Sequence, residues 1–245
     1  MTYNREREKY MNLKVALVVP NKDDAILEMK KMLAIQEADI YIFPEGFLSE
    51  GDLHYAVEIS QTFNKFIISG LVLRTENTSC QKAVIIDNGK IIGEYQKNIL
   101  SQAEKTKGRV AGSSIYCIES KYGIIGIPIC YEIHFPEVAR VMSLENPCCL
   151  VNLIGTGMYN ELQYEQWLAL ARARAIENEL YVFGCSHYNG TIPIAYAIAP
   201  DGRVIGESRN SYGCIILDVD LENSFEKEYM YLRDRLPDRF VKLSV

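Results

Sequence analysis

The stretch Ala83-Val-Ile-Ile-Asp-Asn-Gly-Lys-Ile-Ile-Gly-Glu-Tyr95 decides how this chain folds, because it ends one pattern and begins another. Asn88-Gly89 stands between two apolar runs, which is a strong signal for a β-hairpin. Before this stretch, strand-like and helix-like segments alternate as in β-α-β units. The hairpin then brings adjacent strands, so the sequence predicts an α/β fold of two packed sheets with helices outside, rather than one doubly wound sheet.

Working outward from the hairpin, the expected strands are short and rich in aliphatic residues. Upstream they cover residues 13–19, 40–43 and 66–73, with helices after the turn at 20–24 and over residues 52–63. Downstream they cover residues 115–118, 123–129, 148–154, 180–185, 194–198 and 214–219. Helices are expected from Pro136, a residue suited to a first helical turn, and over residues 161–178. No linker stands out, so we expect one domain over residues 1–245.

Composition limits the partners of the chain. Of its 245 residues, 48% are hydrophobic and 24% are charged, and the net charge is −6. This acidic balance opposes binding to nucleic acid, because contacts to phosphates need clustered Lys and Arg. The apolar runs are far shorter than the roughly 20 residues that span a bilayer, so no membrane contact is expected.

The N-terminus and the cysteines indicate a reducing compartment. Residues 1–9 are charged and lack the apolar run of a secretory signal, which predicts a cytoplasmic protein. The seven cysteines are scattered among strand-like segments, so we expect no disulfide. Neither the cysteines nor the three histidines have the spacing of a metal site, and no bound metal is expected.

Three residues that can carry chemistry each follow an expected strand: Glu45, Lys97 and Cys130. Ligand sites in α/β sheets gather beyond the carboxyl ends of strands. By residue type alone, a cysteine in this place is more often a buried structural residue. Cleavage of an amide, however, needs a nucleophile, a proton carrier and a positive group near the oxyanion, and these three side chains can fill those roles. We expect Glu45 to carry the proton, and Lys97 to lower the pKa of the thiol and stabilise the oxyanion together with the backbone N–H of Tyr131.

The residues around these three positions resemble motifs of the nitrilase superfamily of carbon–nitrogen hydrolases. Tyr41-Ile-Phe-Pro-Glu-Gly-Phe47 resembles its glutamate motif, and Tyr95-Gln-Lys-Asn-Ile-Leu100 resembles its lysine motif. Ile129-Cys-Tyr-Glu-Ile-His-Phe-Pro-Glu137 resembles its nucleophile motif. Trp167 with Ala171-Arg-Ala-Arg-Ala-Ile-Glu-Asn178, and the Pro-Asp-Gly turn at 200–202, are similar to two further features. The five matches occur in the order of the family and cover about residues 13–220.

The resemblance implies both a fold and a reaction. The implied fold is the four-layer α-β-β-α sandwich of the nitrilase type. The implied reaction is hydrolysis of a non-peptide carbon–nitrogen bond in a small amide or carbamoyl amide, releasing ammonia or an amine and a carboxylic acid. A triad of Glu45, Lys97 and Cys130 would form a thioester acyl-enzyme that water resolves, with no cofactor. Relatives usually pair through helices, so a homodimer or larger assembly is expected.

The resemblance also suggests supporting residues. Glu104 falls where similar enzymes carry a second glutamate on a loop near the triad, there to orient the substrate or Lys97. Asn152 matches the position of a substrate-pocket loop that follows a strand. Glu132 stands where aspartate is frequent and His134 where arginine is common, which puts the supporting salt bridges of the family in doubt more than its chemistry.

Other interpretations remain open from sequence alone. Cys130 with His187 and Asn189 would form a peptide-hydrolase arrangement, although no signature of such a family surrounds Cys130. Nitrile hydrolysis is an alternative, although true nitrilases usually show Cys-Trp-Glu where this chain has Cys-Tyr-Glu. An inactivated hydrolase that serves as a binding scaffold is another. Gly155 and Gly157 suggest a phosphate cradle, but the third glycine of the dinucleotide fingerprint is absent.

Overall fold

A first sheet is built around the apolar strands that precede the Asn-Gly hairpin. The computed structural model describes residues 13–35, 37–221 and 231–240. The members of this sheet are β1 (Leu13–Val19), β2 (Ile40–Ile42), β3 (Leu48–Ser49), β4 (Phe66–Arg74), β5 (Ser79–Asp87), β6 (Lys90–Gln96) and β13 (Gly213–Val219). Their order is β13-β1-β2-β4-β5-β6, with β3 paired to β4. Strands β1, β2 and β4 run parallel, and the others on the main path join antiparallel.

The predicted hairpin closes this sheet on one side. Asn88 and Gly89, between β5 and β6, have φ angles of 43° and 80°. Two successive residues with positive φ match the twist of antiparallel strands, which is why Asn-Gly favours this turn. The hairpin carries the chain from β5 back along β6, so that Lys97 follows directly at the end of β6.

A second sheet repeats the same plan. Its members are β7 (Ile118–Ser120), β8 (Gly123–Gly126), β9 (Cys149–Ile154), β10 (Tyr181–Ser186), β11 (Ile194–Ile198) and β12 (Val204–Arg209). Their order is β12-β11-β10-β9-β8-β7. Strands β8, β9 and β10 are parallel, and β7, β11 and β12 join antiparallel.

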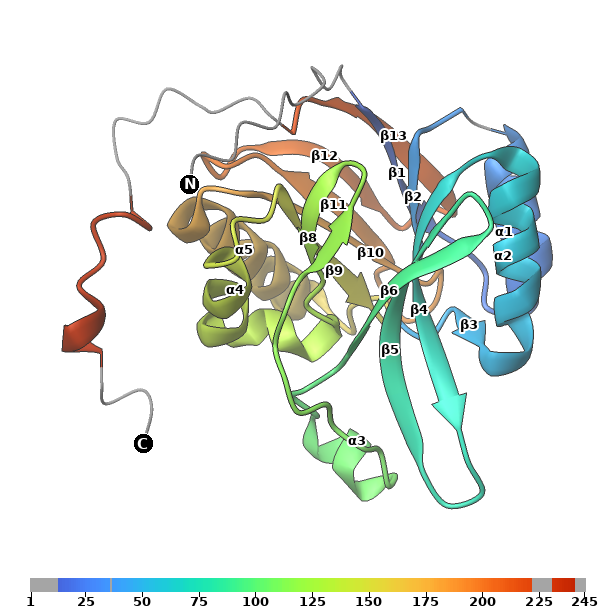
Figure 1. Cartoon of the computed structure of the whole chain (residues 1–245), viewed down its shortest axis with the longest axis horizontal. Helices are drawn as coiled ribbons and strands as arrows, with labels where there is room; N and C mark the ends of the chain where they lie inside the picture. The colour runs from blue at the N-terminus through green and yellow to red at the C-terminus, as the bar shows by residue number, and fades with distance from the viewer. Residues whose placement is uncertain (1–12, 36, 222–230, 241–245) are drawn as a thin grey trace, which may run out of the picture.

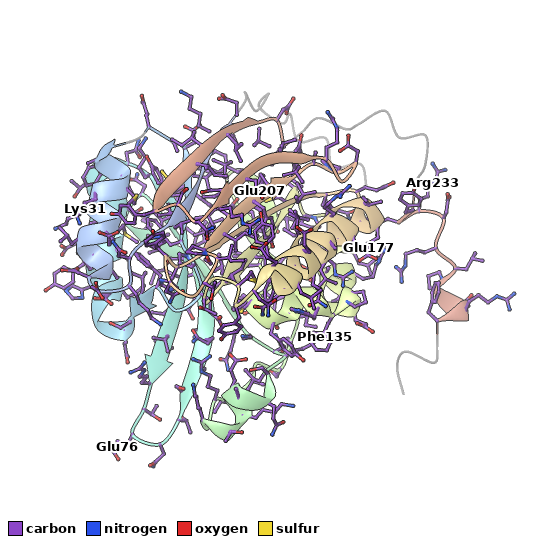
Figure 2. The ribbon with its side chains drawn as sticks, turned by 180° about the vertical axis from the view of Figure 1, so that it is seen from behind. Lys31, Glu76, Phe135, Glu177, Glu207 and Arg233 are labelled. Atoms are coloured by element: carbon purple, nitrogen blue, oxygen red, sulfur yellow. The ribbon has the colours of Figure 1, made fainter. Side chains whose placement is uncertain are left out.

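Helices cover the outer face of each sheet (Figure 1). Helices α1 (Ala25–Ile35) and α2 (Leu53–Phe63) lie on the first sheet, and α4 (Pro136–Ser143) and α5 (Glu161–Asn178) lie on the second. Figure 2 shows Lys31 of α1 and Glu177 of α5 on opposite sides of the molecule. The predicted four-layer α-β-β-α sandwich is therefore confirmed. None of the helices in the described ranges is long and apolar enough to cross a membrane.

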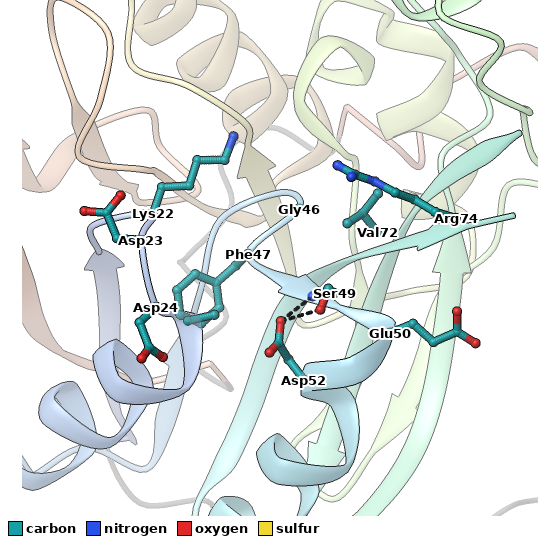
Figure 3. Close-up of a pocket in the computed structure, with 11 residues that line it drawn as sticks. Lys22, Asp23, Asp24, Gly46, Phe47, Ser49, Glu50, Asp52, Val72 and Arg74 are labelled. Atoms are coloured by element: carbon teal, nitrogen blue, oxygen red, sulfur yellow. Dashed lines mark hydrogen bonds between the residues drawn. The ribbon is translucent and has the colours of Figure 1, made fainter. Parts of the chain in front are cut away.

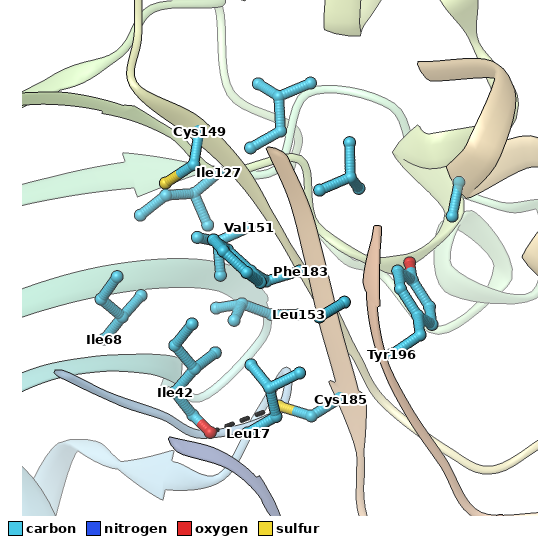
Figure 4. Packing of buried hydrophobic residues seen from close by; sticks show 14 of the residues in the cluster. Leu17, Ile42, Ile68, Ile127, Cys149, Val151, Leu153, Phe183, Cys185 and Tyr196 are labelled. Carbon is cyan, nitrogen blue, oxygen red and sulfur yellow. Dashed lines mark hydrogen bonds between the residues drawn. The ribbon is translucent and has the colours of Figure 1, made fainter. Parts of the chain in front are cut away.

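Apolar side chains fill the space between the two sheets (Figure 4). Leu17 and Ile42 of the first sheet face Leu153 and Phe183 of the second, and all four are buried. The Cys185 thiol adds a polar link, donating to the carbonyl of Ile42 at 3.3 Å. Burial of one such side chain is worth about 1.5–3 kcal/mol, so this layer fixes the two sheets against each other. This packing therefore fixes the position of the strand ends of one sheet relative to those of the other.

The structure differs from the sequence prediction at several polar or short elements. Strand β12 was not expected, because Val204–Arg209 is an edge strand with exposed, partly charged residues and does not read as an apolar run. The two-residue β3 and the helix α3 (Gln102–Thr106) were also not expected. The strand predicted over 123–129 ends at Gly126, just before Ile127-Pro128, and the one predicted over 115–118 begins only at Ile118.

Candidate active site

Cys130 lies on a strained turn where the second sheet ends. It begins the short 3-10 helix η2 (Cys130–His134) and has a φ of 49°. A residue with a side chain in this left-handed region is uncommon, and the conformation costs of order 1–3 kcal/mol. A sharp turn between strand and helix is one known way to present a nucleophile.

Asn152 holds this turn in place. Its amide Nδ2 donates to the carbonyls of Pro128 at 2.9 Å and of Cys130 at 3.3 Å. Its Oδ1 accepts from the indole N–H of Trp167 at 3.1 Å and from the hydroxyl of Tyr196 at 3.0 Å. The expectation that Asn152 lies on a substrate-pocket loop is wrong, because it is a fully buried residue inside β9 whose donors and acceptor are all engaged.

Lys97 lies between two buried carboxylates. Its Nζ is 2.9 Å from Glu45 Oε1 and 2.8 Å from Glu104 Oε1, and its side chain is 1% exposed. Burial alone would lower the pKa of Lys97, but the charge of Glu45 and the hydrogen bond from Lys97 to Glu104 outweigh it and raise that pKa. Lys97 is therefore a permanent cation.

The Cys130 thiol is neutral in the resting enzyme. Burial raises its pKa to about 12, the charge of Glu45 acts in the same direction, and the charge of Lys97 opposes both. Lys97 was expected to lower the pKa of the thiol. Its charge does act in that direction, but the pKa of Cys130 is raised overall, so the expected low pKa is wrong. A hydrogen bond from the thiol to the Glu45 carboxylate also contributes, so the proton already has an acceptor.

Glu45 is positioned through its own backbone. The ring Nε2 of His187 lies 2.9 Å from the carbonyl of Glu45, and because a carbonyl only accepts, Nε2 carries the proton. Burial lowers the pKa of His187 to about 4, which keeps the ring neutral. Gly155 leaves room for the carboxylate, since a Cβ at this position would lie 2.4 Å from Glu45 Oε2.

Cys130, His187 and Asn189 do not form the peptide-hydrolase arrangement that the sequence left open. His187 is bonded to the backbone of Glu45, while the side-chain oxygen of Asn189 accepts from the N–H of Gly157 at 3.2 Å. His187 Nδ1 is buried and has no hydrogen-bond partner within the described residues. The histidine therefore supports Glu45 and does not pair with the thiol.

Glu132 joins the nucleophile turn to the lysine segment. Its Oε2 accepts from the backbone N–H of Ile129 at 2.8 Å. Its Oε1 accepts from the N–H groups of Asn98 at 2.7 Å and Ile99 at 3.2 Å, and from the Tyr95 hydroxyl at 3.0 Å. Burial raises the pKa of Glu132, although each of these donors acts against that shift. Glu132 therefore supports the site by accepting from three backbone N–H groups and the Tyr95 hydroxyl, and not through a salt bridge.

Glu104 is more enclosed than the sequence indicated. It lies on the short helix α3, not on a loop, and is 9% exposed. Ser101 and Glu104 form a capping box, and Arg109 donates to Glu104 Oε1 at 2.6 Å. Burial would raise the pKa of Glu104, but hydrogen bonding and charge from Lys97 lower it. Glu104 is thus the second carboxylate that holds Lys97, together with Glu45.

A cavity of about 450 Å³ opens over these groups. Glu45, Lys97, Glu104, Cys130 and Tyr131 all line it. Within the described ranges, no group of three or more His, Cys, Asp or Glu side chains could hold a metal ion. The arrangement can deliver a thiol to a small carbonyl compound, accept its proton and offer a fixed positive charge beside it.

Two packed sheets with outer helices, and a buried glutamate–lysine pair beside a cysteine on a strained turn, are the architecture of the nitrilase superfamily. The sequence agrees, because the model of the carbon-nitrogen hydrolase family matches residues 18–226. This chain belongs to that family.

Known proteins of several organisms are similar to the chain. An omega-amidase of Escherichia coli is 23% identical over 231 residues, which covers 85% of this chain and 86% of that protein. A Schizosaccharomyces pombe protein named a "probable nitrilase" is 29% identical over 168 residues, or 65% of this chain and 60% of that protein. The crystal structure of a carbon-nitrogen hydrolase from Helicobacter pylori has a TM-score of 0.85 at 18% identity, covering 95% of this chain and 98% of that one.

Sequence reasoning missed part of the site. Arg109 was not singled out, Gly155 was considered only as part of a phosphate cradle, and His187 was considered only as a partner of the thiol. One signal was present in the sequence: Ser101-x-x-Glu104 is a capping-box pattern, which would have predicted the start of α3. The role of His187 depends on a residue 142 positions away and has no local signal.

Proposed function

We propose that this enzyme hydrolyses a small amide through a thioester on Cys130, with Glu45 as proton carrier and Lys97 as the fixed positive charge. One observation carries the proposal. The Lys97 ammonium contacts the Glu45 carboxylate at 2.9 Å, and that carboxylate also bonds to the Cys130 thiol inside one cavity. Nucleophile, base and electrostatic group are thus within reach of one bound carbonyl.

In the first half of the reaction, the Cys130 sulfur attacks the amide carbon as its proton moves to Glu45. Because the pKa of the thiol is raised to about 12, attack and proton transfer are coupled and no free thiolate accumulates. The carbonyl oxygen takes the electron pair and becomes an oxyanion, with Lys97 and the backbone N–H of Tyr131 as its stabilising groups. Glu45 then gives the proton to the nitrogen, the carbon–nitrogen bond breaks, and ammonia or an amine leaves.

In the second half, water resolves the thioester. Glu45 takes a proton from the water as its oxygen attacks the carbonyl carbon, and a second oxyanion forms at the same place. The carbon–sulfur bond breaks, the carboxylic acid leaves, and the proton returns to Cys130. Glu45 thus acts twice as base and twice as acid, while Lys97 keeps its charge throughout.

The proposed substrate class also draws on relatives. The Escherichia coli protein with 23% identity is named an omega-amidase, which favours a terminal amide as the bond cleaved here. Nitriles remain in the test, because the Schizosaccharomyces pombe relative carries the name of a nitrilase. The Cys130-Tyr131-Glu132 sequence favours the amide, because true nitrilases usually show Cys-Trp-Glu at this place.

Release of ammonia from a panel of small amides, carbamoyl compounds and nitriles tests the proposal. We expect turnover of amides by the native enzyme and none by Cys130→Ala. Intact-protein mass spectrometry during turnover should show an adduct equal to the amide minus ammonia. Equal ammonia release by native enzyme and Cys130→Ala would contradict the mechanism, and turnover of nitriles alone would replace the amide as substrate. No turnover of any compound would favour a scaffold built on an inactive hydrolase.

We also propose that the chain forms a homodimer or larger homo-oligomer. Val141 and Ile176 on the outer helices α4 and α5 are 40% and 37% exposed, and Leu144 just after α4 is 55% exposed. Apolar side chains on an outer helical face favour self-association. Light scattering after size exclusion should give at least twice the monomer mass of 27.9 kDa. A single monomer peak at micromolar concentration would contradict this proposal.

A further inference from the structure

A second cavity adjoins the one that contains Cys130. It has a volume of about 540 Å³ and lies over Phe47 and Ser49 (Figure 3). Four residues line both cavities, so the two meet there: Lys22, Gly46, Val72 and Arg74. A molecule whose amide lies at Cys130 can therefore extend to this junction.

Lys22 and Arg74 are the charged residues at the junction. Figure 3 shows the ends of both side chains directed into the space near Gly46, from opposite sides. Both residues are exposed, and neither forms an ion pair with any residue that the structure describes. Two cations that face each other without a carboxylate between them favour an anion in that space.

None of the carboxylates that line the outer cavity forms an ion pair with Lys22 or Arg74. Asp24 accepts from a backbone N–H at the first turn of α1, and Asp52 accepts from a neighbouring serine. Asp23 and Glu50 point away from the two cations in Figure 3. Lys22 and Arg74 are therefore not paired with any described carboxylate, while the four carboxylates make the outer end of this cavity negative.

The inner cavity, in contrast, is lined by more cations than carboxylates. Five of its lining side chains are cationic and two are carboxylates, and both carboxylates, Glu45 and Glu104, are bonded to Lys97. Lys107 at its rim also forms no ion pair with a described residue. The inner cavity thus differs in sign from the whole chain, which carries a net charge of −6. Such a cavity concentrates anions.

We propose that Lys22 and Arg74 bind a carboxylate at the far end of the substrate, so that the enzyme selects amides carrying a second, anionic group. This inference rests on the proposed function and names its substrate class. The planar guanidinium of Arg74 can hold a carboxylate with two parallel hydrogen bonds, and Lys22 adds a point charge. With one end at the junction, the amide at the other end is oriented toward Cys130.

Binding to an enzyme that cannot turn over separates this inference from the chemistry. Cys130→Ala is titrated calorimetrically with the monoamides of succinic, glutaric and adipic acid and with their neutral methyl esters. We expect at least one monoamide to bind about 10- to 100-fold more tightly than its ester, which is the range for a charge-assisted hydrogen bond. Raising the salt concentration should reduce this ratio, because both cations are exposed.

Variants then assign the preference to the junction. Adding Arg74→Gln to Cys130→Ala should remove most of the difference in affinity between the monoamide and its ester, while the affinity for the ester stays unchanged. Arg74→Lys should retain part of that difference. Lys90→Gln is the matched control, because Lys90 is an exposed lysine away from both cavities. The inference would be overturned if each of the three monoamides bound with the same affinity as its methyl ester. It would also be overturned if Arg74→Gln weakened the binding of monoamide and ester equally. Turnover of the monoamides by the native enzyme reports on the proposed function separately.

Discussion

The two halves of the molecule share one plan and use it differently. The first half has the parallel strands β1, β2 and β4 followed by β5 and β6, and the second has β8, β9 and β10 followed by β11 and β12. The first half contributes the charged residues, Glu45 and Lys97. The second contributes Cys130 on a strained backbone. The site exists only because both sheets end at the same place.

Each half supports its contribution by a different kind of interaction. Helices α1 and α2 close on the first sheet through apolar side chains such as Met29, Ile59 and Val84. The layer under α5 instead contains the buried hydrogen-bond network of Asn152 and Trp167. Buried charges of opposite sign stabilise each other, whereas a strained turn needs hydrogen bonds to hold it. The comparison therefore predicts different consequences when each half is altered.

Loss of the lysine charge should have the largest effect. Lys97→Met leaves Glu45 buried without a cation and leaves Glu104 with Arg109 alone, which we expect to lower the free energy of unfolding by about 3–5 kcal/mol and to abolish turnover. Urea denaturation and ammonia release measure the two effects. Lys82→Met is the control, because its pair with Glu94 is partly exposed and should contribute less than about 1 kcal/mol. Similar losses in both variants would contradict the assigned role of burial.

Loss of the Asn152 side-chain amide, which holds the turn at Cys130, should have the second largest effect. Asn152→Ala leaves the Trp167 N–H and the Tyr196 hydroxyl without their acceptor and frees the turn at Cys130. We expect a loss of about 2–4 kcal/mol in the free energy of unfolding, together with a lower kcat. Asn77→Ala, on the exposed turn between β4 and β5, serves as control for urea denaturation and kinetics. Full activity in Asn152→Ala would show that the turn keeps its shape without the hydrogen bonds.

His187 links the halves and should show its effect through pH. The pKa of histidine is 6.5 when free and about 4 at this site, so the unfolded chain binds a proton between these values and the folded chain does not. Stability is therefore complete above pH 6.5 and falls as pH decreases, by about 2 kcal/mol at pH 5 from this residue.

His187→Phe should remove this part of the pH dependence and lower kcat about two- to tenfold, since the Glu45 carbonyl loses its donor. Urea denaturation at pH 7 and pH 5 and steady-state kinetics make the measurement. His54→Phe, at an exposed site on α2, is the control. An unchanged difference between pH 7 and pH 5 in His187→Phe would contradict the assignment, and recovery of kcat in His187→Gln would support a positioning role.

The smallest effect on stability should come from Gly155, where the two halves touch at the site. Gly155→Ala places a Cβ 2.4 Å from Glu45 Oε2 and so displaces the carboxylate. We expect kcat to fall roughly 10- to 100-fold while the free energy of unfolding changes by less than about 1 kcal/mol. Gly51→Ala is the control, because the nearest atom to its new Cβ is 3.9 Å away. A large loss of stability without loss of activity would reverse this assignment.

The sequence predicted what depends on neighbours along the chain. The Asn88-Gly89 hairpin, the strands before Glu45 and Cys130, and the α-β-β-α layers followed from periodicity, turn chemistry and motif order. The edge strand β12 was missed, because polar edge residues do not form an apolar pattern.

The contacts that connect the two halves could not be read in this way. Glu132 bonds to residues 33 and 34 positions away, and His187 bonds to one 142 positions away. Asn152 was expected at a substrate-pocket loop because of the resemblance to the family, whereas in the structure it lies inside β9 and bonds to Trp167 and Tyr196. Side-chain partners across a fold depend on how the sheets stack, which one sequence does not specify.

The strand β13 has a consequence for how the protein is made. It pairs with β1 along its whole length, from Leu13 opposite Val219 to Val19 opposite Gly213, although about two hundred residues separate them. During synthesis β1 is therefore an unpaired edge until residue 219 has left the ribosome, and such edges recruit other chains. Ribosome-bound chains that stop before residue 213 should accordingly need chaperone protection, and completion of the first sheet is among the last events of folding.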